Sequence, residues 1–177
     1  MIEIRGHAVP NTTEEITVKD FDAISVIDSD QDKGVIEKWV EKFCHFGVPE
    51  EAFDDMSVDE LVGHTEAFNS GFEVPEKHIT EVEIDGFKYA APDILGAKDV
   101  SLIEKAMNKD KSSIGRMTLA IVFKREDLSR TEHYTDAHIK QKAKLFADQP
   151  CKLVLPYLTD VMNSLLRSTE ETLEDAE

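Results

Sequence analysis

The sequence contains only two cysteines and lacks the short motifs that identify common enzyme classes. Cys44 and Cys151 lie far apart and form no C-x-x-C pair, so nothing resembles a disulfide framework and a reducing compartment is the simpler expectation. The eight glycines form neither G-x-x-x-x-G-K-[ST] nor G-x-G-x-x-G, and there is no G-x-S-x-G. We therefore expect no enzymatic activity and no bound cofactor.

Long apolar runs are also missing. The longest run, residues 119–123, is far too short to span a bilayer. Residues 1–5 do not have the pattern of a signal peptide. These features predict a cytoplasmic protein that does not enter a membrane.

Basic residues are scarce in the first half of the chain, which accounts for most of the net charge of −17. Residues 1–90 carry 22 acidic and seven basic residues, whereas residues 91–168 carry 10 acidic and 13 basic ones, and residues 169–177 add five acids and no base. An acidic surface repels phosphate backbones and anionic lipids and attracts basic partners. No direct nucleic-acid binding is expected; a merely solvated acidic surface remains an alternative.

Hydrophobic periodicity predicts a mainly α (α+β) fold, a compact multi-helix domain with one small antiparallel sheet. The clearest amphipathic helix covers residues 31–46. Capping patterns and apolar spacing predict further helices that begin near Thr17, Ser57, Ser101, Ser112 or Ser113, Asp136 and Pro150. The expected core includes one apolar residue or more from most helices: Trp39, Phe43, Leu61, Met117, Ile121, Phe146, Leu158 and Met162.

The best strand signal is the hairpin 79–91, in which apolar and polar residues alternate on both sides of an Asp85-Gly86 turn. Residues 2–9 alternate as well and predict one short strand that joins this hairpin. Residues 15–18 are expected to pair with that strand or with a later hairpin.

One helical domain, residues 1–168, is the simplest organisation, followed by an acidic flexible tail, residues 169–177. Two related lobes, residues 1–71 and 92–168, joined by the hairpin 79–91, are the alternative. A Phe-x-Asp pattern precedes a capped helix in each of them, at Phe53 and at Phe146.

The sequence offers only weak candidates for a metal site or a catalytic nucleophile. His133 and His138, with Glu132 and Asp136, have the wrong spacing for two histidines on one helix face. The neighbours Cys44 and His45 point about 100° apart on a helix, which does not create a nucleophile–base pair. The acids near Asp54 lack the ordered spacing of a calcium loop, so we expect no metal site.

Lysines and arginines of the second half can form a positive strip with Tyr134 as the nearby aromatic residue. The alternative roles of this strip are a phosphate contact, a solvated face, or an intramolecular or homomeric partner for the acidic half. The strip would contain Lys124, Arg125, Arg130, Lys140, Lys142 and Lys144.

An opening at residues 16–21 is followed by a helix at 39–43, the phrase at 53–61, and later segments at 86–89, 117–125 and 144–146, before a terminal amphipathic helix. As a pattern, this order of elements resembles a group of tailed-bacteriophage proteins of tail and baseplate assembly, which includes tail assembly chaperones. The resemblance implies a non-enzymatic chaperone or minor structural component in the host cytoplasm or the virion. Its expected partner is a tape-measure or baseplate protein.

The leading interpretation is therefore a protein that binds a basic or helical protein partner, and homo-oligomers remain open. Acidic residues near two helix ends are the candidate protein-binding positions: Asp54, Asp55, Asp59, Glu60, Glu170, Glu171 and Glu174. The alternative function is an acidic nucleic-acid mimic that inhibits a host defence nuclease, as anti-restriction or anti-CRISPR proteins do. An enzyme without a recognisable motif is a third hypothesis.

Overall fold

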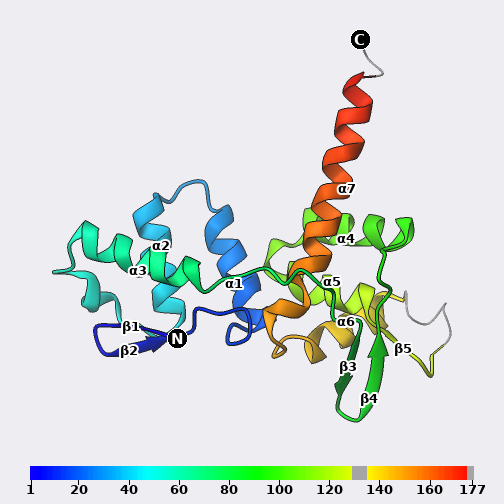
Figure 1. The fold of residues 1–177 in the computed structure, drawn as a ribbon, viewed down its shortest axis with the longest axis horizontal. Coiled ribbons are helices and arrows are strands. Elements are labelled where there is room, and N and C mark those ends of the chain that lie inside the picture. The colour runs from blue at the N-terminus through cyan, green and yellow to red at the C-terminus, as the bar shows by residue number, and fades with distance from the viewer. Residues whose placement is uncertain (129–134, 175–177) are drawn as a thin grey trace.

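The computed structural model describes residues 1–128 and 135–174, and for residues 167–174 it describes the backbone only. Within these ranges the chain is mainly helical, which confirms the predicted fold class (Figure 1). In chain order the elements are β1 (Ile2–Ile4), β2 (His7–Val9), α1 (Val18–Ser29), α2 (Val35–His45), η1 (Glu50–Phe53), α3 (Val58–Ser70), β3 (Glu81–Ile84), β4 (Phe87–Ala90), α4 (Ala97–Lys109), η2 (Lys111–Ser113), α5 (Ile114–Val122), β5 (Lys124–Arg125), α6 (Asp136–Leu145), η4 (Cys151–Leu153) and α7 (Leu155–Glu174).

The described residues form two small antiparallel sheets instead of the single sheet predicted. Residues 2–9 are not one strand, because Arg5 and Gly6 adopt positive φ and turn the chain back, so that β1 pairs with β2. Strands β3 and β4 pair around Asp85 and Gly86 as predicted, and both turn residues have positive φ. The third strand of this sheet is β5 and not the N-terminal segment.

Two helices begin as predicted, at residues whose side chains accept a hydrogen bond from a backbone amide in the first helical turn. Thr17 and Asp20 form a reciprocal capping box on α1, and the Ser57 hydroxyl accepts from the Glu60 amide at the start of α3. The start predicted at Ser101 is wrong, because α4 begins four residues earlier, at Ala97, with Gly96 as its N-cap. Residues 97–100 are already helical, so the Ser101–Glu104 pattern falls inside α4.

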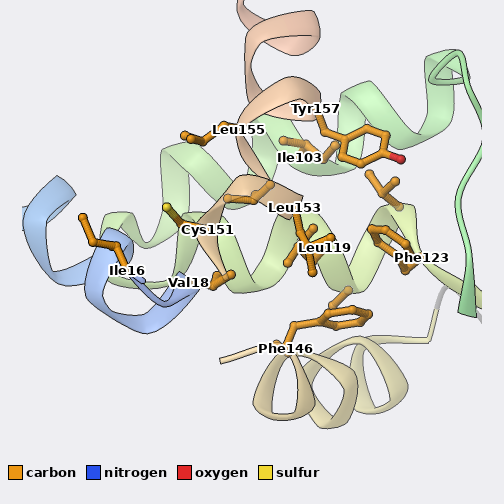
Figure 2. Packing of buried hydrophobic residues seen from close by; sticks show 14 of the residues in the cluster. Ile16, Val18, Ile103, Leu119, Phe123, Phe146, Cys151, Leu153, Leu155 and Tyr157 are labelled. Atoms are coloured by element: carbon orange, nitrogen blue, oxygen red, sulfur yellow. The ribbon is translucent and has the colours of Figure 1, made fainter. Parts of the chain in front are cut away.

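Helix α5 forms the centre of the main hydrophobic core. Its residues from Thr118 to Val122 are fully or almost fully buried, as its apolar sequence predicts. Figure 2 shows that segments distant in sequence surround it, including Val18, Ile103, Phe146 and Tyr157. This packing makes α5 a rigid support for α4 and α6, which contact it.

A second set of contacts, rich in aromatic rings, joins α2, η1 and α3. The ring of Phe43 is buried and lies 5.6 Å from that of Trp39 and 6.1 Å from that of Phe68, measured between ring centroids. Phe53 of η1 stacks on Phe43 at 6.3 Å. Aromatic pairs of this kind stabilise a core beyond their area alone, which explains how a strongly acidic segment holds together.

Residues 16–18 form backbone hydrogen bonds with residues 149–151, which precede the last helix. The Val18 amide donates to the Gln149 carbonyl and the Cys151 amide donates to the Ile16 carbonyl, both at 2.8 Å. This pairing corrects the expectation that residues 15–18 join the N-terminal strand or a hairpin. Figure 1 shows the elements up to α3 on one side and α4 to α7 on the other, with α1 packed on α5.

The last helix, α7, leaves the body of the molecule and projects outward in Figure 1. Val161 is fully buried, but Met162 is 47% exposed and Leu166 is 58% exposed, so the prediction of Met162 as a core residue is wrong. The backbone stays helical to Glu174, through most of the segment predicted as a tail. No helix in the described ranges combines the length and the apolarity that crossing a membrane requires.

Candidate protein-binding groove

Helices α4, α5 and α6 line a groove with an apolar floor. It consists of two adjoining hollows of about 280 and 340 Å³ that share Ala106, Lys109, Met117 and Lys140. The floor contains one pair of apolar residues from each helix: Leu102 and Ala106, Met117 and Ile121, and Ile139 and Ala143. Each pair is four residues apart, so it lies on one helix face. Ile121, Ile139 and Ala143 are almost fully buried, so the half-buried Leu102, Ala106 and Met117 supply most of the apolar floor that a partner can contact.

Four exposed lysines flank this floor. Lys105 and Lys109 stand one turn apart on α4, and Lys140 and Lys144 stand one turn apart on α6. Among the described residues, none of the four forms an ion pair. Like charges at i and i+4 destabilise a helix by a few tenths of a kcal/mol. An acidic partner in the groove would remove that repulsion.

Within the part of the chain that the structure describes, two carboxylates line the same groove, and one of them is engaged. Asp110 accepts hydrogen bonds from the Ser112 amide and hydroxyl and from the Ser113 hydroxyl. The bond from the Ser112 side chain contributes most to holding the pKa of Asp110 below its usual value. Asp136 is exposed in the first turn of α6, where it complements the helix dipole. The rim is thus predominantly positive in a protein with a net charge of −17.

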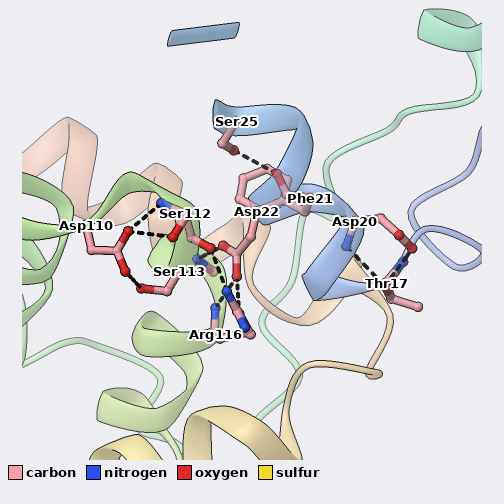
Figure 3. A network of polar contacts seen from close by, with 10 residues as sticks. Thr17, Asp20, Phe21, Asp22, Ser25, Asp110, Ser112, Ser113 and Arg116 are labelled. Atoms are coloured by element: carbon pink, nitrogen blue, oxygen red, sulfur yellow. Dashed lines mark hydrogen bonds and ion pairs between the residues drawn. The ribbon is translucent and has the colours of Figure 1, made fainter. Parts of the chain in front are cut away.

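A buried carboxylate from the other side of the molecule fixes one end of the groove (Figure 3). Asp22 of α1 is 1% exposed and accepts from the Gly115 amide at 2.5 Å and from Arg116 Nε at 2.6 Å. Burial raises the pKa of Asp22, against the opposing effect of Arg116. Arg116 also donates to the Ser112 carbonyl, so its guanidinium is held in place at the groove wall.

The positive strip predicted from the sequence does not exist as a continuous surface. Lys142 is buried and donates to the Phe123 carbonyl at 2.8 Å, and burial lowers its pKa to about 8. Lys124 pairs with buried Asp99 at 3.1 Å. Arg125 binds Asp127 and lies over the Phe87 ring. Arg130 and Tyr134 lie outside the described residues. Of the strip residues that the structure describes, Lys140 and Lys144 line the groove.

The sequence reading missed Lys105 and Lys109, the other half of the rim. Their spacing repeats that of Lys140 and Lys144, four residues apart, and this shared signal was available. Nothing in the sequence, however, places α4 and α6 on opposite sides of the same α5 face. That arrangement comes from the packing of the three helices.

The acidic candidate residues do not gather in one place. Asp54 and Asp55 precede α3, and Asp59 and Glu60 lie in its first turn. Arg5 compensates part of this cluster, with Nε 3.1 Å from Glu60 and Nη2 3.6 Å from Asp55. The second group, Glu170, Glu171 and Glu174, lies in the projecting part of α7, where the backbone alone is described (Figure 1).

Within the described residues, the clusters considered as a metal site or a catalytic nucleophile do not come together as a reactive site. Glu132 and His133 lie outside them, and no group of three or more His, Cys, Asp or Glu within the described ranges is placed to hold a metal ion. His45 binds Asp20 at 2.9 Å across the α1–α2 contact, and burial raises the pKa of the Cys44 thiol. Cys151 is fully buried, with a pKa raised to about 12.

A larger hollow, of about 690 Å³, lies at the beginning of α4, between that helix and β5. Its buried carboxylate is already paired, because Asp99 in the first turn of α4 binds Lys124 from β5. Asp99 also complements the dipole at the helix start, where a bound anion would otherwise be favoured. We therefore regard the lysine-rimmed groove as the better candidate site.

Comparisons of the chain with protein-family models, with curated protein sequences and with solved structures gave no match. The features that bear on function are therefore the groove and the distribution of charge.

Proposed function

We propose that this chain is a non-enzymatic binding protein whose lysine-rimmed groove holds an acidic amphipathic helix. The observation that carries the proposal is the combination of an apolar floor, around Met117 and Ile121, with two lysine pairs that have no ion-pair partner among the described residues. A helix bound in a groove places its apolar face on such a floor and its charges at the rim. Opposite charges across the contact give specificity and faster association.

The resemblance to tailed-phage proteins supplies a biological process for this activity. In that setting the chain would act as a chaperone or minor component in tail or baseplate assembly and bind a helical segment of a structural protein. The acidic cluster before and within α3, including Asp54 and Asp59, would provide a separate surface for a basic partner. Co-purification with a tail or baseplate protein, and lower solubility of that protein without the chain, would support this placement.

A direct test of the groove uses a designed peptide. A 20-residue acidic amphipathic helix with a fluorescent label is titrated with the full chain, and binding is followed by anisotropy. A scrambled peptide of the same composition is the control, because it keeps the charge but loses the apolar face. The variant Lys140→Glu/Lys144→Glu should weaken binding at least about 10-fold, since two attractive contacts become repulsive. Equal binding of both peptides, or no binding of either, would refute the proposed groove function.

The nucleic-acid-mimic alternative receives no specific support from the geometry. A mimic needs carboxylates arrayed at roughly phosphate spacing and available to a nuclease. Several acids of the first half are instead paired within the chain, among them Asp20 with His45, Asp28 with Lys42 and Glu60 with Arg5. These pairs reduce the acidic surface that a DNA-binding protein could contact.

A further inference from the structure

We infer that the segment held in the groove is the projecting half of α7 from a second copy of this chain. The inference rests on the proposed function of the groove and names its occupant. Self-association of this kind joins two different surfaces, the groove of one copy and the C-terminal helix of the next.

The projecting half of α7 has the apolar face that the groove requires. Met162 and Leu166 are one turn apart and are 47% and 58% exposed. Continuing along the helical backbone, position 173 is again leucine, seven residues after Leu166. Residues 162, 166, 169 and 173 follow the spacing of one helix face. An exposed apolar face on a projecting helix indicates a surface that another molecule covers.

The charges of the two surfaces are complementary. In sequence the projecting half of α7 contains three acids, Glu170, Glu171 and Glu174, and one base, Arg167, whereas the groove is flanked by Lys105, Lys109, Lys140 and Lys144. Two copies of α7 packed against each other would bring like charges together, which disfavours a symmetric α7–α7 contact. The groove offers this helix both an apolar floor and opposite charge.

The lengths also agree. Leu102 and Lys109 are seven residues apart along α4, or about 10 Å, and the part of the α7 face from Leu166 to residue 173 has the same length, with Met162 one further turn toward the body. Val161 is fully buried, and none of residues 162–166, the rest of α7 whose side chains the structure describes, is buried; residue 174 lies 13 residues beyond Val161, or about 20 Å along the helix. Because α7 is continuous and points away from the body, its free end is presented to another copy (Figure 1).

The expected assembly is head to tail. A contact between two different surfaces leaves one groove and one helix unused at the ends, so association continues into open chains or closes into a ring. A contact of two helical turns is small, so the affinity should be weak, with a Kd on the order of 10–500 μM.

Sedimentation velocity of the full chain, from about 10 μM to about 1 mM, tests the inference over this range. The expected result is a weight-average sedimentation coefficient that rises with concentration and falls back in high salt. The groove variant Lys140→Glu/Lys144→Glu and the helix variant Met162→Ser/Leu166→Ser should each remain monomeric. The control Lys77→Glu/Lys88→Glu makes the same change in net charge at two exposed lysines outside the groove and should associate like the parent chain.

Mixing the two inactive variants gives the sharpest result. One keeps an intact α7 and the other an intact groove, so the mixture should form dimers and no larger species. Association that survives in the groove variant but is lost in the helix variant would indicate an α7–α7 contact and overturn the inference. A parent chain that stays monomeric at about 1 mM would also overturn it. If the designed peptide still binds the groove in that case, the proposed function stands and only the second copy is wrong.

Discussion

Asp22 on α1 accepts a 2.6 Å hydrogen bond from Nε of Arg116 on α5, although the two residues are 94 positions apart in the chain. The same carboxylate accepts from the Gly115 amide, so it completes the start of a helix whose own N-cap, Ser113, makes no side-chain capping bond to the helix. The beginning of the chain thus fixes the helix that forms the groove floor. Binding at the groove and the packing of the acidic half are physically connected through this contact.

Removing the Asp22 carboxylate should destabilise the protein. Asp22→Ala leaves the Gly115 amide and the Arg116 guanidinium without their acceptor and should lower the free energy of unfolding by about 2–4 kcal/mol. Asp22→Asn keeps an acceptor oxygen and should cost roughly half as much. Urea denaturation followed by circular dichroism measures both. Equal stability of the parent chain and the alanine variant would contradict this role.

Gly115 allows α1 and α5 to approach closely. A Cβ at this position would lie 3.0 Å from Asp22 Oδ1 and 3.0 Å from Val18 Cγ1. We expect Gly115→Ala to push the helices apart and to cost about 1–3 kcal/mol. Gly63 in α3 is the matched control, because a Cβ there meets nothing within 4 Å and Gly63→Ala should stabilise by about 0.5–1 kcal/mol. Thermal unfolding of the two variants should shift in opposite directions.

The buried charge of Lys142 should make stability depend on alkaline pH. Its pKa falls from 10.5 to about 8, mainly because of burial and also because of Lys124, so the folded protein binds this proton more weakly than the unfolded chain. Between pH 8 and 10.5 the unfolded chain binds more protons, and stability therefore rises with pH over that range. Below pH 8 the buried charge lowers the free energy of unfolding by about 3 kcal/mol. Above pH 10.5 this cost is absent.

The variant Lys142→Met isolates this effect. It removes the charge but keeps most of the side-chain volume, at the loss of the hydrogen bond to the Phe123 carbonyl, about 1 kcal/mol. At pH 7 the variant should be the more stable protein, and its advantage should disappear as the pH approaches 10.5. Denaturant titrations of both proteins at several pH values provide the comparison. A stability difference that does not change with pH would show that Lys142 has the same pKa in the folded and unfolded protein and would contradict the lowered pKa.

The two faces of α7 should respond differently to truncation. Val161 is fully buried, so Val161→Ala should cost about 1–3 kcal/mol through lost burial and a new cavity. Met162 is its neighbour on the exposed face, and Met162→Ala should change the free energy of unfolding by less than about 0.5 kcal/mol. Measurements at low protein concentration keep self-association from contributing. A large loss with Met162→Ala would place this residue in the core.

Local sequence patterns predicted the elements well where one short-range rule decided the outcome. The Asp85-Gly86 turn, the Thr17 cap and the apolar helix α5 agree with the structure. Prediction failed at Ser101, where a capping pattern lies inside a helix, and at Arg5-Gly6, where a turn splits one expected strand into two. In each failure two local patterns competed, and contacts from elsewhere in the chain selected one.

The sequence by itself determined the helical class, the strong acidity of the first half and the acidity of the C-terminal segment, because composition and periodicity carry this information directly. Only the tertiary structure decided which lysines remain available. Lys140, Lys142 and Lys144 look alike in sequence, yet Lys142 is buried against Phe123 while the other two line a groove with Lys105 and Lys109. The reason is geometric: residues two apart on α6 point in different directions, and the packing of α4 and α5 determines which direction faces solvent.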